Sequence, residues 1–338
     1  MSSEVNSVNI ITDGDLIRYF TSFDCSDGFL LLYKGEKLLY VDNRYYFASK
    51  QNAKATSVLL SEGSLNEFIT KNAIKSVGIV YEYTSASFLK DLNELGVEVY
   101  DCADYIASLT SVKTDSEISV IKQSCQIAEK SFFQLLPFIK EGITERDLKL
   151  ELEYIMAKNG AEKPSFDTII AFGENSAVPH HKTSNKKLTA NQPILIDFGC
   201  LYNGYCSDMT RTLFFGKPNE EFLKVYNAVK QAHLTAFENI TLGTMGKVAD
   251  GYARKVLDDN GYLKYFTHSL GHGIGVKIHE SPRLNVKSEY VLKNGNVFSI
   301  EPGVYLNGKF GVRIEDTVAL IDGKCVSMMT SDKNPIIL

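Results

Sequence analysis

Hydrophobic and polar residues follow two different patterns in the first third of the chain. Short apolar runs that are rich in β-branched and aromatic residues, such as FLLLY from Phe29 and SVGIVY from Ser76, predict strands. Residues 65–74 and 85–95 instead place their apolar positions at helical spacing, and Gly96 is positioned to end the second helix. Strands that alternate with helices predict an α/β domain.

Near residue 113 the chain turns polar, and the apolar positions then recur at helical spacing. Thr114 or Asp115 is placed to begin a long helix with one apolar face. The same periodicity predicts later helices over residues 144–158, 220–239 and 247–260. Strand-like runs lie between and after these helices, so this part of the chain is expected to form an α+β domain.

Charge also separates the two parts of the chain. Residues 1–112 carry 9 basic and 15 acidic side chains, whereas residues 113–338 carry 27 and 26. We therefore expect a smaller N-terminal domain over residues 1–112 and a larger domain over residues 113–338. The net charge of −5 and the 44% of apolar residues are typical of a folded globular protein. The mild acidity argues against nucleic acid or an anionic membrane as a partner.

The sequence offers no sign of export or membrane insertion. The first 20 residues lack the basic and apolar regions of a secretory signal, and no run approaches the roughly 18 apolar residues of a membrane-spanning helix. The six cysteines are scattered without a C-x-x-C pair, which favours reduced thiols. We therefore expect a cytoplasmic protein that does not bind a membrane.

Acidic residues stand in the middle of two apolar hairpins, where an unpaired carboxylate is costly to bury. The first hairpin, ILIDFGCLYNGYCSDMTRTLFF, contains the two-residue turn Asn203-Gly204. Pairing about this turn makes the numbers of opposite residues sum to 407, so Asp197 faces Thr210. Asp208 then lies diagonally from Asp197 on the same face of the sheet.

The second hairpin, FSIEPGVYLNGKFGVRIEDTVAL, turns around Gly308. If its loop has an odd number of residues centred on Gly308, opposite residue numbers sum to 616 and Glu301 faces Glu315. Like charges at opposite positions are destabilising unless a cation lies between them. The two hairpins together therefore predict a metal site, and Arg313, two residues before Glu315, faces the same side.

Histidines close to these acids provide the candidate nitrogen ligands. His268, His272 and His279 lie within HSLGHGIGVKIHESP. Carboxylates with one imidazole suit Mn²⁺, Co²⁺ or Zn²⁺ better than a metal selected by thiolates. The sequence after His279-Glu280 lacks the second histidine of an H-E-x-x-H zinc site, and G-H-G-I-G opens no phosphate-binding helix. We interpret Tyr305 as a packing residue.

In the order of their motifs these residues resemble the pita-bread metallopeptidases, a family that includes Xaa-Pro aminopeptidases, proline dipeptidases and methionine aminopeptidases. The resemblance implies a pita-bread catalytic domain preceded by a smaller α/β domain of the creatinase type. It rests on Pro179-His180, Asp197 in D-F-G, Asp208 in S-D-M-T-R-T, His272 in G-H-G-I-G, His279 in H-E-S-P, Glu301 in E-P-G and Glu315 in R-I-E-D.

The resemblance also implies roles for these residues. Two divalent ions, for which we expect Mn²⁺ with Co²⁺ or Zn²⁺ as alternatives, are held by Asp197, Asp208, His272, Glu301 and Glu315, and Asp208 and Glu315 bridge them. His180 and His279 are expected to be catalytic residues that contact the substrate, and Glu301 is our candidate for proton transfer. For His181 a structural role and a substrate contact are equally open, and we retain it with Arg313 as a predicted substrate residue.

Spacing within the family points to its proline-specific branch. Glu301 and Glu315 lie 14 residues apart and an additional domain precedes them, whereas methionine aminopeptidases usually have a longer gap and lack this domain. Residues 19–51 resemble a signature of bacterial Xaa-Pro aminopeptidases, although Cys25 replaces its glycine. We expect a homodimeric aminopeptidase that acts on peptides with proline at the second position. A proline dipeptidase is the alternative, and a metal-free binding paralogue or creatine hydrolase is a further one that the intact ligands disfavour.

Overall fold

The computed structural model describes residues 7–338 and separates the chain into two compact units, Met1–Leu109 and Thr110–Leu338. The first six residues of the predicted N-terminal domain therefore lie outside the described part. Within residues 7–338 no helix combines the length and the apolar character that crossing a membrane requires. Each unit has a sheet and a buried core of its own, as the predicted patterns indicate.

The first unit is built around a mixed six-stranded sheet with the order β4-β3-β2-β1-β5-β6. Its strands are β1 (Ser7–Ile11), β2 (Phe29–Tyr33), β3 (Glu36–Val41), β4 (Thr56–Leu59), β5 (Ser76–Ile79) and β6 (Glu98–Asp101). Its helices are α1 (Gly14–Thr21), α2 (Asn43–Asn52), α3 (Ser64–Lys71), α4 (Ala86–Glu94) and α5 (Ala103–Thr110), with a 3₁₀ turn η2 (Tyr81–Tyr83). The strands and the two helices predicted from residues 29–95 are thereby confirmed, and Gly96 adopts the positive φ of 72° that ends α4.

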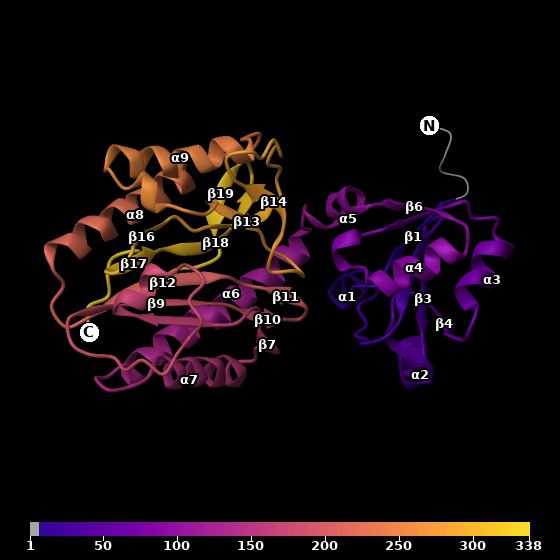
Figure 1. Ribbon diagram of the computed structural model, residues 1–338, viewed down its shortest axis with the longest axis horizontal. Coiled ribbons are helices and arrows are strands. Elements are labelled where there is room, and N and C mark those ends of the chain that lie inside the picture. The colour runs from indigo at the N-terminus through magenta and orange to yellow at the C-terminus, as the bar shows by residue number, and fades with distance from the viewer. Residues whose placement is uncertain (1–6) are drawn as a thin grey trace. The chain divides into compact units, whose positions relative to one another are not determined.

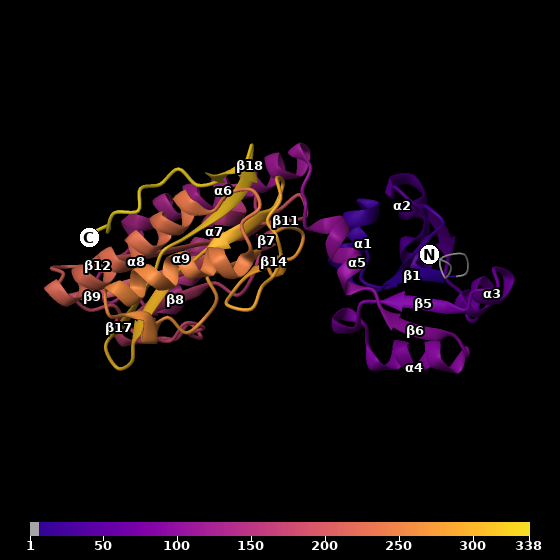
Figure 2. The same ribbon diagram turned by 90° about the horizontal axis from the view of Figure 1, so that it is seen from above.

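The second unit carries two pairs of helices, and in Figure 1 the strands lie between these pairs. The pairs are α6 (Asp115–Leu135) with α7 (Glu145–Lys158), and α8 (Glu220–Asn239) with α9 (Gly246–Asp259). Thr114 and Thr144 begin the first pair with capping boxes, because each hydroxyl accepts the third backbone N–H of its helix. Each pair packs against strands through its own apolar cluster, and Figure 2 shows α8 and α9 running along each other.

The main sheet of this unit is antiparallel, with the order β14-β13-β15-β18-β12-β9-β8 and with β19 paired to β18. Its strands are β8 (Ile169–Phe172), β9 (Gln192–Phe198), β12 (Met209–Phe215), β13 (Gly271–Gly273), β14 (Glu280–Leu284), β15 (Val297–Ile300), β18 (Glu315–Ile321) and β19 (Lys324–Ser327). Smaller ladders use β7 (Lys163–Pro164), β10 (Cys200–Tyr202), β11 (Tyr205–Cys206), β16 (Gly303–Leu306) and β17 (Phe310–Arg313). Three short 3₁₀ turns complete the unit, η3 (Leu136–Phe138), η4 (Gly173–Ala177) and η5 (Leu263–Tyr265).

Both predicted hairpin registers are confirmed. Asn203 and Gly204 have φ values of 47° and 80°, which a two-residue hairpin turn of this kind requires. Asp197 is the partner of Thr210, as the sum of 407 predicts. Across the second hairpin, Ile300 pairs with Asp316 and Gly303 with Arg313, so the sum of 616 holds on both sides of Glu301.

Candidate metal centre

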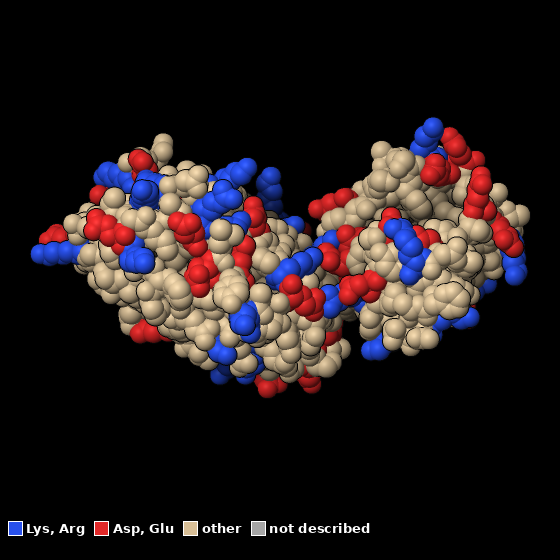
Figure 3. Space-filling view, turned by 90° about the horizontal axis from the view of Figure 1, so that it is seen from below, with Lys and Arg blue, Asp and Glu red and all other residues tan. Residues whose placement is uncertain are grey.

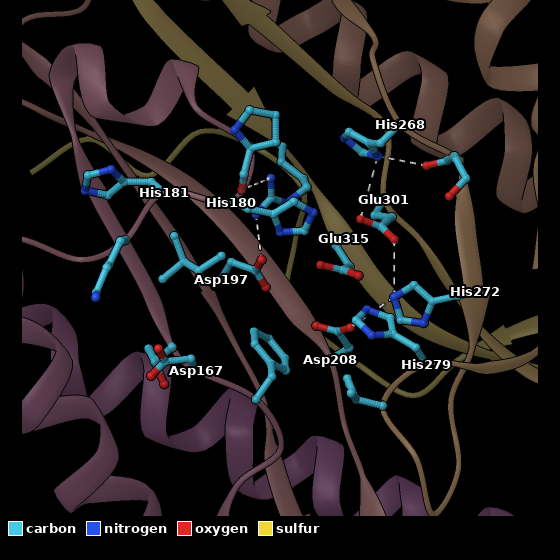
Figure 4. A pocket seen from close by; sticks show the side chains of 18 of the residues that line it. Asp167, His180, His181, Asp197, Asp208, His268, His272, His279, Glu301 and Glu315 are labelled. Atoms are coloured by element: carbon cyan, nitrogen blue, oxygen red, sulfur yellow. Dashed lines mark hydrogen bonds and ion pairs between the residues drawn. The ribbon is translucent and has the colours of Figure 1, made fainter. Parts of the chain in front are cut away.

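The predicted acids come from separate strands and meet in one place. Thr210 explains part of this arrangement, because it pairs with Asp197 on one side and with Glu315 on the other. Three neighbouring strands thus place one carboxylate on each side of this threonine. Figure 4 shows the carboxylates of Asp208, Glu301 and Glu315 lying close to the ring of His272.

A cavity of about 620 Å³ opens onto these carboxylates. Every residue that the sequence predicts for the site lines this cavity, namely His180, His181, Asp197, Asp208, His272, His279, Glu301, Arg313 and Glu315. The structure therefore brings the whole predicted set together, although the motifs are spread over 136 positions from 180 to 315. His268, the third candidate histidine of the sequence, also lines the cavity, together with Arg283, which the sequence analysis does not select.

The distances within the cluster fit metal ligation. Asp208, His272 and Glu315 each offer one ligand atom within 4.8 Å of the others. The Nε2 atom of His272 lies 3.5 Å from Oδ2 of Asp208 and 3.4 Å from Oε1 of Glu301. Figure 4 marks the second of these contacts. One imidazole and several carboxylates around a common point form the oxygen-rich donor set that hard and intermediate divalent ions prefer.

Unpartnered buried oxygens are the clearest sign that these residues fit a cation. Oδ1 of Asp197, Oδ1 of Asp208 and Oε1 of Glu315 are buried and accept no hydrogen bond from any residue in the described part of the chain. A buried polar atom without a partner costs free energy, and three such oxygens on neighbouring carboxylates compound that cost. Divalent cations would satisfy all three oxygens and offset the repulsion between the carboxylates.

Burial and mutual repulsion also raise the pKa values of the carboxyl groups in the cluster. Burial and the neighbouring charge of Glu315 raise the pKa of Asp208 well above its usual range. Burial and the charge of Glu301 do the same to Glu315, and burial raises the pKa of Glu301 to about 8. Burial lowers the pKa of His272 to about 3, so its imidazole is neutral at physiological pH and can act as a ligand.

Arg313 is the cation already present beside the acids. Its Nη2 donates to Oδ2 of Asp197 at 2.6 Å, and its Nε donates to Oγ1 of Thr210 at 3.1 Å. Thr210 in turn donates from Oγ1 to Oε2 of Glu315 at 2.6 Å. One buried guanidinium therefore orients two of the predicted ligands, one directly and one through Thr210.

Tyr305 is buried, as expected of a packing residue, and its hydroxyl also belongs to this network. Nη1 of Arg313 donates to the Tyr305 hydroxyl at 2.6 Å, and this hydroxyl lies 2.8 Å from Nε2 of His268. Nδ1 of His268 lies 2.8 Å from the carbonyl oxygen of Ser269, so Nδ1 carries the hydrogen and Nε2 accepts from Tyr305. Tyr305 thus connects His268 with Arg313.

The predicted catalytic histidines lie on the wall of the cavity. The ring of His279 stacks edge-on against His272, with 4.3 Å between centroids and 73° between ring planes. The side chain of His180 is exposed to the cavity. His181, in contrast, places Nε2 at 2.9 Å from Oε2 of the buried Glu145, and Figure 4 shows its ring apart from the acidic cluster. Its role as a substrate residue stays a prediction.

Comparisons with known proteins agree with this geometry. The Creatinase/Prolidase N-terminal domain matches residues 1–112, and Metallopeptidase family M24 matches residues 119–322. An Xaa-Pro dipeptidase of Pyrococcus furiosus is 39% identical, over 87% of this chain and 85% of its own. The structure of an Xaa-Pro dipeptidase from Bacillus anthracis superposes with a TM-score of 0.94 at 34% identity, over 98% of this chain and 95% of its own.

An aminopeptidase is similar to nearly the same degree. The crystal structure of an X-Pro aminopeptidase from Thermotoga maritima superposes with a TM-score of 0.90 at 33% identity, over 98% of this chain and 97% of that one. The shared catalytic fold, the acidic cluster and the matched family all lead to one assignment. The chain is a member of metallopeptidase family M24, in which a creatinase-type N-terminal domain is followed along the sequence by a pita-bread catalytic domain.

Proposed function

We propose that this protein is a metal-dependent Xaa-Pro dipeptidase, which cleaves dipeptides whose second residue is proline. The similar proteins from Pyrococcus and Bacillus anthracis are Xaa-Pro dipeptidases, which supports the dipeptidase, our alternative from the sequence, over the aminopeptidase. The observation that carries the proposal within this chain is Arg283. A dipeptidase has to recognise the free carboxylate of its substrate's proline, which requires a cation inside the cavity.

Arg283 meets that requirement. It pairs with His272 between β13 and β14, so it lies next to the acidic cluster, and its side chain is exposed on the cavity wall. No acidic side chain in residues 7–338 forms an ion pair with it. A guanidinium in this state can bind a carboxylate through two parallel hydrogen bonds. In a longer peptide a neutral amide replaces that carboxylate, and the binding energy is lost.

The remaining residues divide the chemistry among themselves. Asp197, Asp208, His272, Glu301 and Glu315 would hold two divalent ions, for which Mn²⁺, Co²⁺ and Zn²⁺ are the candidates. When bound, such ions supply Lewis-acid activation of water and of the substrate carbonyl. Arg313 keeps Asp197 and, through Thr210, Glu315 in orientation.

Proton transfer and charge stabilisation fall to three side chains. Glu301 accepts a proton during attack and returns it to the prolyl nitrogen, which has no hydrogen of its own in the tertiary amide. His279 donates to the oxygen that becomes negative in the transition state. His180 orients the substrate carbonyl beside it. The neutral form of His279 is favoured before substrate binds, because burial and the neighbouring Arg283 lower its pKa.

Substrates that differ only in the terminal charge test the proposal. The metal-loaded protein is assayed with an Xaa-Pro dipeptide, with the amide of that dipeptide and with an Xaa-Pro-Yaa tripeptide. We expect kcat/KM to be about tenfold or more higher for the free dipeptide, because a hydrogen bond to a charged group contributes about 1.5–3 kcal/mol. Equal values for the dipeptide and its amide would contradict the proposal, and faster cleavage of the tripeptide would favour the aminopeptidase.

Replacing Arg283 with Met locates the recognition. We expect kcat/KM for the dipeptide to fall about tenfold in Arg283→Met, while that for the amide changes by less than about twofold. Lys287→Met is the matched control, because Lys287 is exposed on the same segment but does not line the cavity. A parallel loss on both substrates would show that Arg283 does not read the carboxylate.

The partners of the whole protein stay predictions. Proline-containing dipeptides are the proposed substrates, and homodimerisation is implied by the family resemblance alone. Figure 3 shows acidic and basic side chains interspersed over one face of each unit. Sedimentation of the purified protein measures the oligomeric state directly.

A further inference from the structure

No hydrogen bond or ion pair holds the ring of His180 in place within residues 7–338, and its side chain is exposed on the cavity wall. Its placement therefore depends on the backbone of the segment that carries it, residues 172–184, which has little regular structure beyond the turn η4. A side chain that orients a substrate needs a rigid backbone, because small displacements lower the rate steeply.

Glu145 is the residue that fastens this segment. It is the first residue of α7 and is fully buried, yet it is charged and lies outside the acidic cluster. Its Oε1 accepts from the backbone N–H of Phe172 at 2.8 Å and from Nδ2 of Asn175 at 2.7 Å. Its Oε2 accepts from the N–H and the hydroxyl of Ser184, at 2.9 and 2.5 Å, and lies 2.9 Å from Nε2 of His181. All five partners belong to residues 172–184, on both sides of His180.

The carboxylate is stable in this position despite its burial. These hydrogen bonds outweigh the desolvation, so the pKa of Glu145 lies below its usual value and the group stays ionised. Its location in the first turn of α7 adds a favourable interaction with the helix dipole. The backbone N–H groups of Glu145 and Arg146 also donate to the carbonyls of Lys186 and Ser184. The N-terminus of α7 is thus a fixed platform for the segment.

The opposite side of the segment is fixed to the metal centre. Nη1 of Arg313 donates to the carbonyl oxygen of Pro179 at 3.4 Å, directly before His180. The backbone N–H of Gly311 donates to Oγ of Ser176 at 2.8 Å. His180 is therefore carried by a short span of chain held between Arg313 and Glu145.

We propose that Glu145 is a positioning residue for catalysis, which holds His180 in its working orientation by clamping residues 172–184. The inference rests on the proposed function, because it assigns His180 to the substrate. It also gives His181 a definite task as one of the five groups in the clamp. Glu145 touches neither substrate nor the acidic cluster and acts through His180.

The substitution Glu145→Gln tests this with little change in shape. A carboxamide has one acceptor oxygen, whereas the backbone N–H groups of Phe172 and Ser184 donate to different oxygens of Glu145 and cannot reverse their roles. At least one of these bonds is lost. We expect kcat/KM for an Xaa-Pro dipeptide to fall about 100-fold, with the bound metal per chain unchanged. Glu153→Gln, which alters an outer residue of the same helix, is the control.

A double-mutant cycle distinguishes positioning from a general loss of stability. If Glu145 acts through His180, adding Glu145→Gln to His180→Ala lowers kcat/KM by no more than about twofold, far less than it does alone. Hydrogen exchange of the metal-loaded protein should also accelerate in residues 173–187, and not in α6 or α8. Wild-type activity in Glu145→Gln, additive losses in the cycle or unchanged exchange would each overturn the proposal.

Two additional experiments test the proposal if Glu145→Gln does not fold or if the wild-type protein is inactive on Xaa-Pro dipeptides. If Glu145→Gln does not fold, Ser184→Ala removes a single donor from the clamp, and we expect it to give the same pattern with about a tenfold loss. If the wild-type protein does not hydrolyse Xaa-Pro dipeptides, the proposed function fails. Hydrogen exchange and metal content in Glu145→Gln then still decide whether the clamp orders residues 173–187.

Discussion

Replacing Asp208 with Asn is expected to abolish both metal binding and activity. Asp208 stands at the centre of the cluster, within ligand distance of His272 and Glu315, and one of its oxygens is buried without a partner. An amide supplies a weaker donor and no charge. Because bound ions contribute several kcal/mol to catalysis of this type, kcat/KM should fall about 1000-fold or more. Metal analysis of the purified variant and steady-state kinetics on an Xaa-Pro dipeptide measure the two effects.

Asp167→Asn is the control for this substitution. Asp167 also lines the cavity, but its side chain is 90% exposed and pairs with Lys149 at a distance of 2.5 Å. Removing its charge should leave metal content and turnover close to wild type, since an exposed ion pair contributes little. If Asp208→Asn retained full turnover with two ions bound, the assignment of the metal ligands would be wrong.

The second large effect is the dependence of stability on metal and pH. In the metal-free protein, burial raises the pKa of Glu301 to about 8 and raises those of Asp208 and Glu315 well above their usual range. The folded chain therefore keeps protons that the unfolded chain has already released at neutral pH. The free energy of unfolding then decreases as the pH rises from 7 to 8.

Buried histidines do not disturb this pH window. Burial lowers the pKa values of His233, His268 and His272 to about 4, 3 and 3. These histidines therefore change the stability only at pH values below about 6.5, where the free energy of unfolding rises with pH instead of decreasing. Bound ions replace the protons, so metal should stabilise the protein more strongly at pH 8 than at pH 7. At a free metal concentration 1000 times Kd, this stabilisation amounts to about 4 kcal/mol.

Urea denaturation of chelated and Mn²⁺-loaded protein at pH 7 and 8 measures both quantities. The account predicts that the chelated protein loses more stability over this interval than the loaded protein does, because metal removes the contribution of the carboxyl groups and leaves the smaller one of the buried cysteines. Equal pH dependence of the two forms would show that the raised pKa values do not arise from residues that bind metal.

Much of the site was predictable because the numbers of paired residues have a constant sum across a regular antiparallel hairpin. One well-defined turn at Asn203-Gly204 determined which residues oppose each other, so Asp197 and Thr210 could be paired from the sequence. The same reasoning about Gly308 located Glu301 relative to Glu315. Local signals also determined the helices, since capping residues and apolar spacing act over a few positions.

Arg283 could not be found in this way. β13 and β14 are joined by an irregular loop, and their register shifts between His272 and Gly273, so no constant sum relates the two strands. An exposed arginine in a short strand is also common in any sequence. Its significance comes from its place on the cavity wall, which only the folded chain reveals.

Tyr305 and Glu145 were missed for a different reason. The partners of Tyr305, Arg313 and His268, are side chains whose directions depend on packing, so an aromatic residue in a buried strand gave no sign of its hydroxyl contacts. Glu145 was expected only as a first-turn residue of a helix. Its five bonds form because residues 172–184 return to the N-terminus of α7, and this long-range contact has no periodic signal.

Titration of the metal-free protein with Mn²⁺, followed by turnover of an Xaa-Pro dipeptide, tests the central claim most directly. The account predicts no turnover without metal and a rise that saturates at two ions per chain, because the cluster offers five ligand residues to two ions. Turnover in the metal-free protein, or two bound ions without hydrolysis of an Xaa-Pro bond, would contradict it.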